Sequence, residues 1–200
     1  VKPHDDINDI DQTVYIPDAH TTASDTETED HVGTIGEKVM IRDIVEYKGL
    51  TPGKEYRCCG KLMLKDTGEP FLINEEPVIA ETVFTPEEKD GSVEVIFELD
   101  STLLKGRSTV VFETIYDEDV EVVIHADIDD EAQDVDYPLI GTSAVDSKTR
   151  ERMASVSEET VFSDTVSYEN LPTDGRSYTI KGTLMDEETG EPVLIDGEKL

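Results

Sequence analysis

Short alternations of apolar and polar residues, separated by turn residues, run through most of the chain. In residues 92–99, for example, Val93, Val95, Phe97 and Leu99 would share one face. An alternation with a period of two is typical of a β-strand with one buried face. Further segments predicted as strands are 38–47, 56–64, 78–84, 108–116 and 134–137. About seven short strands in roughly 115 residues predict an all-β, immunoglobulin-like β-sandwich, and no segment indicates a helix.

The same pattern recurs along the chain at a nearly constant spacing. His4 and Gln12 are repeated as His125 and Gln133, in each case 121 residues later. Other pairs with this spacing are Pro17 and Pro138, Thr21 and Thr142, Ala23 and Ala144, Asp25 and Asp146, Asp43 and Asp164, and Tyr47 and Tyr168. One inserted residue then raises the spacing to 122, at which the Thr-Gly-Glu-Pro of residues 67–70 recurs at 189–192. Chance does not produce so many matches, so the sequence predicts tandem repeats.

These repeats divide the chain into three predicted parts. Residues 1–16 would be the C-terminal strand of one repeat, residues 17–138 a complete repeat, and residues 139–200 the N-terminal half of a third. Only Thr13 to Ala19 separate two successive repeats, and Pro17 restricts the backbone there. Tandem sandwiches joined by such short connections are expected to form a rod.

The charge of the chain excludes several classes of partner. A formal net charge of −31 argues against binding to nucleic acid or to anionic membranes. No apolar run approaches the roughly 18 residues of a transmembrane helix, and no signal peptide is present, so the chain is either cytosolic or an internal part of a longer protein. Cys58 and Cys59 are neighbours that would point to opposite faces of a strand, which excludes a disulfide-stapled domain.

Two acidic residues occupy positions that the alternation predicts to be buried. Asp43 lies on the apolar face of residues 38–47, and its repeat Asp164 has the same kind of neighbours. Glu113 lies in the most apolar predicted strand. A carboxylate at a strand edge often bonds only to backbone, but one buried in two copies indicates a partner or a reaction. If Asp43 and Glu113 meet, they would share a proton and one pKa would rise.

Together with these acids, three repeated side chains supply the parts of an acyl transfer. Thr21 offers a hydroxyl nucleophile, and His125 can accept its proton. A protonated carboxyl can polarise the acceptor, and Gln133 offers an acyl carbon with ammonia as the leaving group. The product would be an ester between Thr21 and Gln133, formed once within the chain.

The segment between His125 and Gln133 is predicted to form a β-hairpin with an acidic tip. The two side chains would then face each other about 5 Å apart at the mouth of the hairpin. The tip contains Asp127, Asp129 and Asp130. The earlier copy has Asp6, Asn8 and Asp9 at these positions. Such oxygen ligands could hold Ca²⁺, but the spacing fits no EF-hand loop and a solvated turn is commoner.

At these residues the sequence resembles the VaFE repeats, the intramolecular ester-bond domains of Gram-positive surface adhesins. The resemblance covers residues 17–138 fully and both flanking parts partially. It is carried by Thr21-Thr22-Ala23-Ser24-Asp25, by Asp43-Ile-Val-Glu-Tyr47-Lys-Gly-Leu50, by Val110-Val-Phe-Glu113, and by His125 and Gln133. Here the connection from Glu113 to His125 is shorter than the family usually has. The resemblance implies a CnaB-like, immunoglobulin-like β-sandwich.

The resemblance also assigns roles within this repeat. Thr21 and Gln133 would be the linked pair, His125 the general base, and Asp43 and Glu113 the paired acids, with no cofactor and no metal. Thr22 is a rival nucleophile, but the third copy keeps Thr142 opposite Thr21 and replaces Thr22 with Ser143. His4, Gln12, Thr142 and Asp164 would be partial sites of the flanking repeats, without partners in this chain.

The biological setting follows from the same resemblance. The chain would be a stalk or spacer segment of an extracellular, cell-wall-anchored adhesin, whose signal peptide and sorting signal lie outside residues 1–200. Each complete repeat would crosslink itself without turnover, so the protein would not be an enzyme. Its partners would be neighbouring repeats of the same chain and a host ligand bound by a separate tip domain. Nucleic-acid binding and membrane insertion are not expected.

Four alternatives compete with this interpretation. A lysine–asparagine isopeptide bond needs a repeated lysine, but Lys38, Lys48, Lys54, Lys61 and Lys65 are not repeated, and Lys89 and Lys105 have no counterpart within residues 1–200 for comparison. A thioester is disfavoured because Cys58 and Cys59 align with Ile180 and Lys181. A hydrolase using Thr21, His125 and Glu113 would need an open pocket and an oxyanion loop. The fourth alternative is a plain or calcium-stabilised immunoglobulin-like repeat without a covalent bond.

Overall fold

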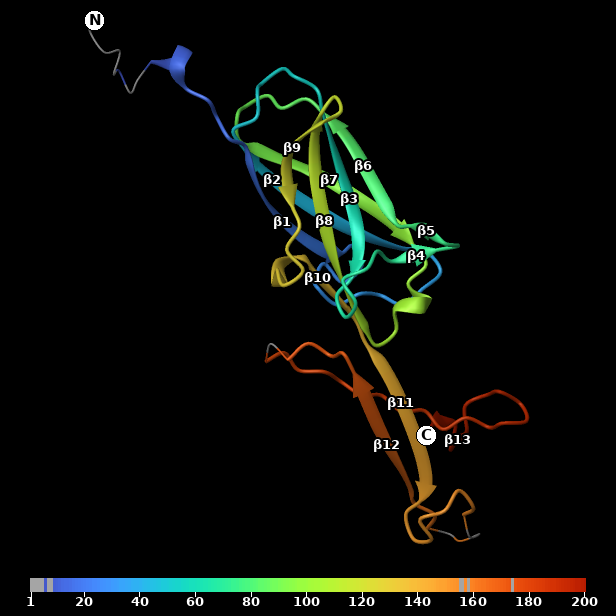
Figure 1. The fold of residues 1–200 in the computed structure, drawn as a ribbon. Coiled ribbons are helices and arrows are strands. Elements are labelled where there is room, and N and C mark those ends of the chain that lie inside the picture. Colours follow the sequence, from blue (N-terminus) through green and yellow to red (C-terminus); the bar gives the residue numbers. More distant parts are fainter. Residues whose placement is uncertain (1–5, 7–8, 155–156, 158, 174) are drawn as a thin grey trace, which may run out of the picture.

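Two antiparallel sheets pack face to face across a hydrophobic core in the part of the chain before residue 138 (Figure 1). The computed structural model describes residues 6, 9–154, 157, 159–173 and 175–200. The first sheet, ordered β1-β2-β7, contains β1 (Asp18–Asp25), β2 (Val39–Lys48) and β7 (Gly91–Leu99). The second sheet, ordered β10-β8-β3-β6 with β9 also on β8, contains β3 (Tyr56–Leu64), β6 (Ile79–Phe84), β8 (Arg107–Asp117), β9 (Val120–His125) and β10 (Asp134–Tyr137). The predicted all-β, immunoglobulin-like sandwich is confirmed.

The remaining elements of this part are short. β4 (Leu72–Ile73) pairs with β5 (Glu76–Pro77), and three single turns of 3₁₀-helix occur at η1 (Ile10–Gln12), η2 (Thr102–Leu104) and η3 (Glu131–Gln133). Within the described ranges the structure contains no α-helix. None of the described helices is therefore long and apolar enough to cross a membrane.

The core forms because the alternating segments turn their apolar positions inward. Every second residue of β2, from Val39 to Tyr47, is buried, and the intervening residues are not. β7 shows the same pattern from Val93 to Leu99. The largest fully buried apolar side chains are Tyr137, Phe97, Ile41, Leu50, Leu62, Leu104 and Ile115. Each such side chain contributes about 1.5–3 kcal/mol through burial, so this layer holds the two sheets together.

The hairpin predicted around residues 125–133 is wrong. In β9, His125 pairs with Glu113 of β8, and in β10, Asp134 pairs with Val110 of the same strand. Both strands are antiparallel to β8, so they run in the same direction and follow each other along one edge. Residues 126–133 do not reverse the chain because Asp130 caps η3, its side chain accepting a hydrogen bond from the Ala132 N–H. The connection therefore advances the chain along β8.

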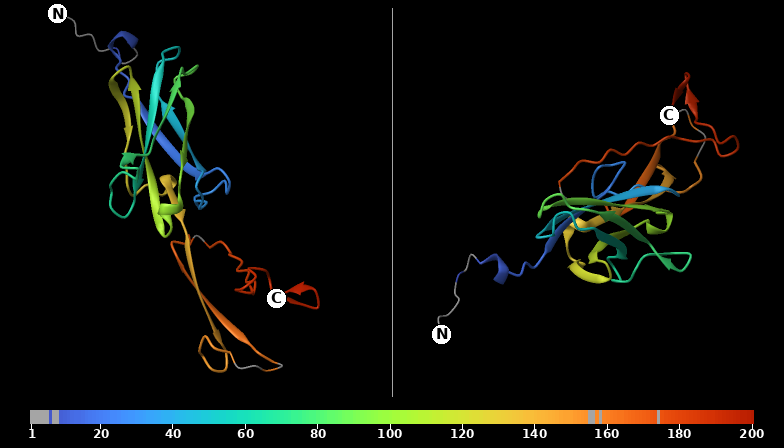
Figure 2. Two further views of the ribbon diagram at one scale, coloured as in Figure 1. Left: turned by 90° about the vertical axis from the view of Figure 1, so that its right-hand side faces the viewer. Right: turned by 90° about the horizontal axis from the view of Figure 1, so that it is seen from above.

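Residues 139–200 repeat the opening of the sandwich. β11 (Leu139–Asp146) pairs with β12 (Phe162–Glu169), and β13 (Leu194–Ile195) pairs with β14 (Glu198–Lys199). Thr142 pairs with Val166 in the same register in which Thr21 pairs with Val45. Counterparts of β7 to β10 are not among the described residues of this part. β11 and the segment before β1 leave the sandwich at opposite ends (Figure 2).

Candidate functional site

Thr21 and Gln133 meet between the opening and closing strands of the sandwich. Thr21 alternates inward with Ala23 and Asp25 on β1, in the first sheet. Gln133 ends η3 and leads directly into β10, in the second sheet. Both residues are 0% exposed, and the Nε2 of Gln133 donates a hydrogen bond to the Oγ1 of Thr21. The neighbouring Thr22 points to the opposite face of β1 and is exposed, so its hydroxyl lies away from the amide.

Two buried carboxyl groups complete this contact. Asp43 on β2 is 0% exposed and Glu113 on β8 is 2% exposed. As two carboxylates they could only accept hydrogen bonds, and both Glu113 oxygens would be buried without a donor. Burial and the adjacent Asp43 charge raise the pKa of Glu113 to about 11. Burial also raises the pKa of Asp43, although hydrogen bonds with Glu113 and Gln133 oppose the rise. The pair therefore holds one proton, on Glu113.

The amide of Gln133 is held by one of its two polar atoms. Its Nε2 also donates to Oδ1 of Asp43 at 3.3 Å, whereas its Oε1 is buried without a hydrogen-bond partner among the described residues. An unsatisfied buried acceptor costs about 1–3 kcal/mol. A rotation of half a turn about the Cγ–Cδ bond would exchange Nε2 and Oε1 and place Oε1 beside Asp43 and Glu113. The site can accommodate either orientation, because nitrogen and oxygen differ little in size. Either orientation keeps the acyl carbon beside the Thr21 hydroxyl.

His125 is held at this site by Asp130, a residue that was predicted to lie in the acidic tip and was given no part in the reaction. The Nε2 of His125 donates to Oδ2 of Asp130 at 2.9 Å, while the other oxygen of Asp130 accepts from the Ala132 N–H at 3.0 Å. Asp130 thus joins the imidazole to the turn that carries Gln133. With its proton on Nε2, His125 has Nδ1 free to accept one. No hydrogen bond joins His125 directly to Thr21 or Gln133 in the described residues.

One sequence signal could have identified Asp130. Asp9 occupies the same place in the earlier copy, where its Oδ1 accepts from the Asp11 N–H at 3.0 Å. The Gln12 N–H donates to the Asp9 carbonyl at 3.1 Å, and the Gln133 N–H donates to the Asp130 carbonyl at 3.0 Å. The turn is therefore encoded locally in both copies. His20, whose ring lies edge-on to His125 at 6.5 Å between centroids, carries no comparable signal because Gly141 replaces it in the next copy.

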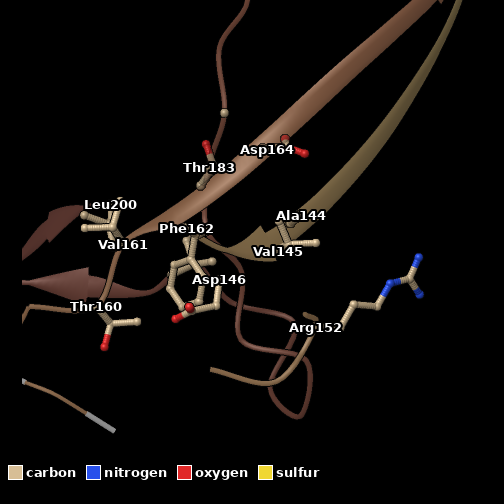
Figure 3. A pocket seen from close by; sticks show the side chains of 12 residues that line it. Ala144, Val145, Asp146, Arg152, Thr160, Val161, Phe162, Asp164, Thr183 and Leu200 are labelled. Carbon is tan, nitrogen blue, oxygen red and sulfur yellow. The ribbon is translucent and has the colours of Figure 1, made fainter. Parts of the chain in front are cut away.

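The flanking copies do not form this constellation in the described residues. Gln12, Thr142 and Asp164 are exposed, and His4 lies outside the described residues. A hollow in the second part is lined by Ala144, Phe162, Asp164, Thr183 and Leu200, among others (Figure 3). Ala144, Phe162 and Asp164 are counterparts of Ala23, Ile41 and Asp43, which are fully buried in the complete sandwich. The hollow is thus uncovered core surface, and none of Thr21, His125 and Gln133 lines it.

The lysines, cysteines and aspartates that the isopeptide, thioester and calcium alternatives require do not form a comparable buried contact in the described residues. The lysines Lys38, Lys54 and Lys65 form ion pairs with Glu98, Asp117 and Asp134. Cys58 is buried, Cys59 is partly buried, and both are free thiols. Asp127 accepts a hydrogen bond from the Asp129 N–H at 3.0 Å, so the acidic turn uses its carboxylates to fix its own backbone. In the described part of the chain, no three His, Cys, Asp or Glu side chains converge to hold a metal.

Comparison with known proteins gives a family match that covers most of the chain. The model of the T-Q ester bond containing domain matches residues 17–137 and again residues 138–199. No curated protein matches the chain. Two crystal forms of a bacterial adhesin from Mobiluncus mulieris, described as containing intramolecular disulfide, isopeptide and ester bond cross-links, have TM-scores of 0.48. Their sequences are 12% and 13% identical to this chain. Each match covers 77% of this chain, and the matches cover 76% and 77% of the adhesin chains. A β-glucuronidase from glycoside hydrolase family 2 has a TM-score of 0.38 and 12% identity, over 52% of this chain and 10% of its own.

Proposed function

This chain belongs to the family of T-Q ester bond containing domains, and from that premise we propose that Thr21 and Gln133 become joined by an ester bond that the domain forms itself. One observation carries the proposal. The Thr21 hydroxyl on β1 and the Gln133 amide, immediately before β10 of the other sheet, are in contact and fully buried. A hydroxyl and an amide held together in a dry site have the proximity that acyl transfer needs.

In the proposed reaction, the Oγ1 of Thr21 attacks Cδ of Gln133, a new C–O bond forms, and the Cδ–Nε2 bond breaks. The proton of the hydroxyl passes to Nδ1 of His125 and from there to the departing nitrogen, which leaves as ammonia. Asp130 stabilises the imidazolium that forms in between, because its carboxylate accepts the Nε2–H bond. Atoms and charge balance without a cofactor or an external reagent.

Glu113 and Asp43 would make the acyl carbon of Gln133 more reactive in this scheme. When the amide is turned so that Oε1 faces the acids, the shared proton of Glu113 and Asp43 can be donated to the oxygen on which negative charge develops. A donor fixed in a water-free site typically contributes about 3–4 kcal/mol to such a transition state. Because burial keeps the pKa of Glu113 near 11, the group is still protonated at neutral pH.

The bond would tie the first strand of the domain to the last. The closed loop would contain 112 residues, for which the chain-entropy estimate derived for disulfides gives about 5 kcal/mol of stabilisation. Tension that enters at β1 and leaves at β10 would pass through the ester and bypass the strand hydrogen bonds. The complete burial of both side chains would protect the ester from hydrolysis.

The wider role that fits this chemistry is structural. We propose that residues 1–16, 17–138 and 139–200 belong to successive repeats of a stalk in a cell-wall-anchored adhesin at the bacterial surface. In support, the flanking segments leave the sandwich at opposite ends, as stacked repeats require (Figure 2). Each complete repeat would react once, without turnover. A separate tip domain would bind the host ligand, so the stalk contacts mainly its own neighbouring repeats.

Intact-mass spectrometry of the 200-residue chain tests the proposed bond. We expect the mass of the chain minus one ammonia, and the full mass for Thr21→Ala. Thr22→Ala is the matched control, since its hydroxyl is exposed on the other face of the same strand, and this variant should still lose ammonia. An unmodified wild-type mass, or a loss of ammonia that persists in Thr21→Ala, would contradict the proposal.

A further inference from the structure

The loop between β1 and β2, residues 26–38, is organised by one carboxylate at the end of β1. Asp25 is 1% exposed, and its Oδ1 accepts hydrogen bonds from the backbone N–H groups of Glu27 at 2.8 Å and Thr28 at 3.1 Å. Its Oδ2 accepts from the N–H of Thr34 at 2.7 Å. Asp25 is on the same inward face of β1 as Thr21, so the strand that carries the nucleophile also fixes the β1–β2 loop.

The β1–β2 loop reaches across the sandwich and pairs with the closing strand. The Asp136 N–H donates to the His31 carbonyl, and the Gly33 N–H donates to the Asp136 carbonyl, each at 2.7 Å. Val32 and Asp136 form a parallel bridge. The Nδ1 of His31 donates to the Asp134 carbonyl at 2.7 Å, one residue after Gln133. β10 is therefore held on one side by β8 and on the other by this loop.

Gly33 makes the close approach feasible. A Cβ at this position would lie 2.4 Å from the Tyr137 ring, which is closer than any real contact. The ring is fully buried and belongs to the last residue of β10. The counterpart of Gly33 in the second part of the chain is Ala154, which has a Cβ.

The counterpart turn in the second part of the chain has the same hydrogen bonds, although the described residues there include no counterpart of β10. Asp146 accepts from the N–H groups of Lys148 at 2.8 Å and Thr149 at 2.7 Å, as Asp25 does from their counterparts. The Asp146 N–H donates to the Glu151 carbonyl at 2.9 Å, and the Asp25 N–H donates to the Asp30 carbonyl at 2.9 Å. The turn is thus specified by local sequence and needs no β10 to fold.

We propose that the β1–β2 loop is a preformed edge that receives β10, and that His31 and Gly33 are positioning residues for the bond between Thr21 and Gln133. The inference rests on the proposed ester. β10 has four residues, and a slip of one residue along β8 would turn Gln133 away from Thr21. Pairing on both sides excludes that slip. The His31 bond to Asp134 acts on the residue next to Gln133 and so fixes the start of the strand.

The rate of ammonia loss after refolding tests this inference in the 200-residue chain. His31→Ala removes the bond to Asp134, and we expect the reaction to be about tenfold slower, as the loss of one buried hydrogen bond implies. His31→Asn, whose side-chain amide can replace Nδ1–H, should restore most of the rate. Arg152→Ala is the matched control, because Arg152 is the counterpart of His31 in the part of the chain where no closing strand is described. It should react like the wild type.

The outcomes separate this inference from the proposed function. If the wild type never loses ammonia, the ester proposal fails. If the wild type reacts and His31→Ala reacts at the same rate, the positioning role fails while the ester stands. Hydrogen exchange in Thr21→Ala provides a second measurement, which does not depend on the His31 variants folding. The Asp136 N–H should be protected before any bond forms, and exchange at the rate of an unstructured chain would also overturn the inference.

Discussion

Glu113 is the residue whose charge state depends most on its surroundings. Its strand partners are Gly60 and His125, and its carboxyl group lies among buried side chains beside Asp43. An isolated ionised carboxylate at this depth would cost several kcal/mol, so the side chain keeps its proton. Protonation makes Glu113 a hydrogen-bond donor, and only in that form can it assist the reaction. The chemistry and the stability of the site therefore depend on the same proton.

The stability of the domain without its ester should fall as pH rises. In the folded chain Glu113 keeps its proton up to about pH 11, whereas its ordinary pKa is 4.5. The folded state binds more protons between these values, so each pH unit removes up to about 1.4 kcal/mol from the free energy of unfolding. Urea unfolding of Thr21→Ala between about pH 5 and pH 9 measures this slope. Adding Glu113→Gln should flatten it, and an unchanged slope would show that another group is responsible.

Asp130 should affect the rate of the reaction more than the fold. Asp130→Asn can still accept the Ala132 N–H bond that caps η3, but it no longer stabilises a positively charged His125. We expect ammonia loss to slow by about a factor of 10²–10⁴, the usual contribution of general acid–base assistance. Timed intact-mass measurements after refolding give this rate. Asp129→Asn, whose side chain belongs to the same turn, is the control and should leave the rate unchanged.

At the scale of elements, close packing of the two sheets beneath the acids is the feature most sensitive to substitution. Gly60 on β3 pairs with Glu113, and a Cβ at Gly60 would lie 2.6 Å from the Phe97 ring of the facing sheet. The absence of a side chain lets β7 approach β3 directly under the site. A larger residue would push the sheets apart where Asp43 and Glu113 must meet.

Gly60→Val should therefore destabilise the domain and slow the crosslink. Overpacking of a filled core typically costs about 1–3 kcal/mol. Urea unfolding in the Thr21→Ala background measures the stability, and intact mass in the Thr21 background measures the bond. Gly182→Val is the matched control, because a Cβ at this counterpart position meets no described atom within 4 Å. Equal effects of the two substitutions would contradict the packing argument.

The strands were predictable from sequence because alternation is local, but their partners were not. The buried faces of β2 and β7 follow from their apolar positions alone, and Asp43 was found as an exception on such a face. The hairpin at residues 125–133 was predicted wrongly, since β9 pairs with β8 through the short turn that joins them, and β10 pairs with the start of β8, at least 24 residues away in sequence. Asp130 was assigned to a solvated tip for the same reason. Its bond to His125 forms only because residues 126–133 fold into η3 and not into a hairpin.

At the scale of the whole molecule, the junction after residue 137 has its own hydrogen bonds. The Nδ2 of Asn170 donates to the Arg107 carbonyl at 2.7 Å, and the Ser108 hydroxyl donates to Oδ1 of Asn170 at 3.2 Å. Arg176 forms an ion pair with Asp30 at 2.7 Å. These contacts join the second part of the chain to the start of β8 and to the β1–β2 loop. A stalk would gain stiffness from such a junction.

Asn170→Gly should loosen this junction without distorting the backbone. Asn170 has a φ of 56°, and its counterpart Gly49 has a φ of 79°, so glycine fits the same conformation. NMR relaxation of amides in β8 and β11 should give one rotational correlation time in the wild type and two different times in the variant. Asn74→Gly is the control, because Asn74 also has a positive φ but lies in the β4–β5 turn. Independent motion already present in the wild type would contradict a stiff junction.

The central claim is a covalent bond between two named side chains, and peptide mapping tests it most directly. Trypsin should release residues 1–38 and residues 108–148 of the uncrosslinked chain as separate peptides. We expect one branched species whose mass is the sum of the two peptide masses minus one ammonia. Fragmentation should place the link at Thr21 and Gln133, and not at Gln12 and Thr142, which lie in the same two peptides. Two separate, unmodified peptides from folded protein would contradict the account.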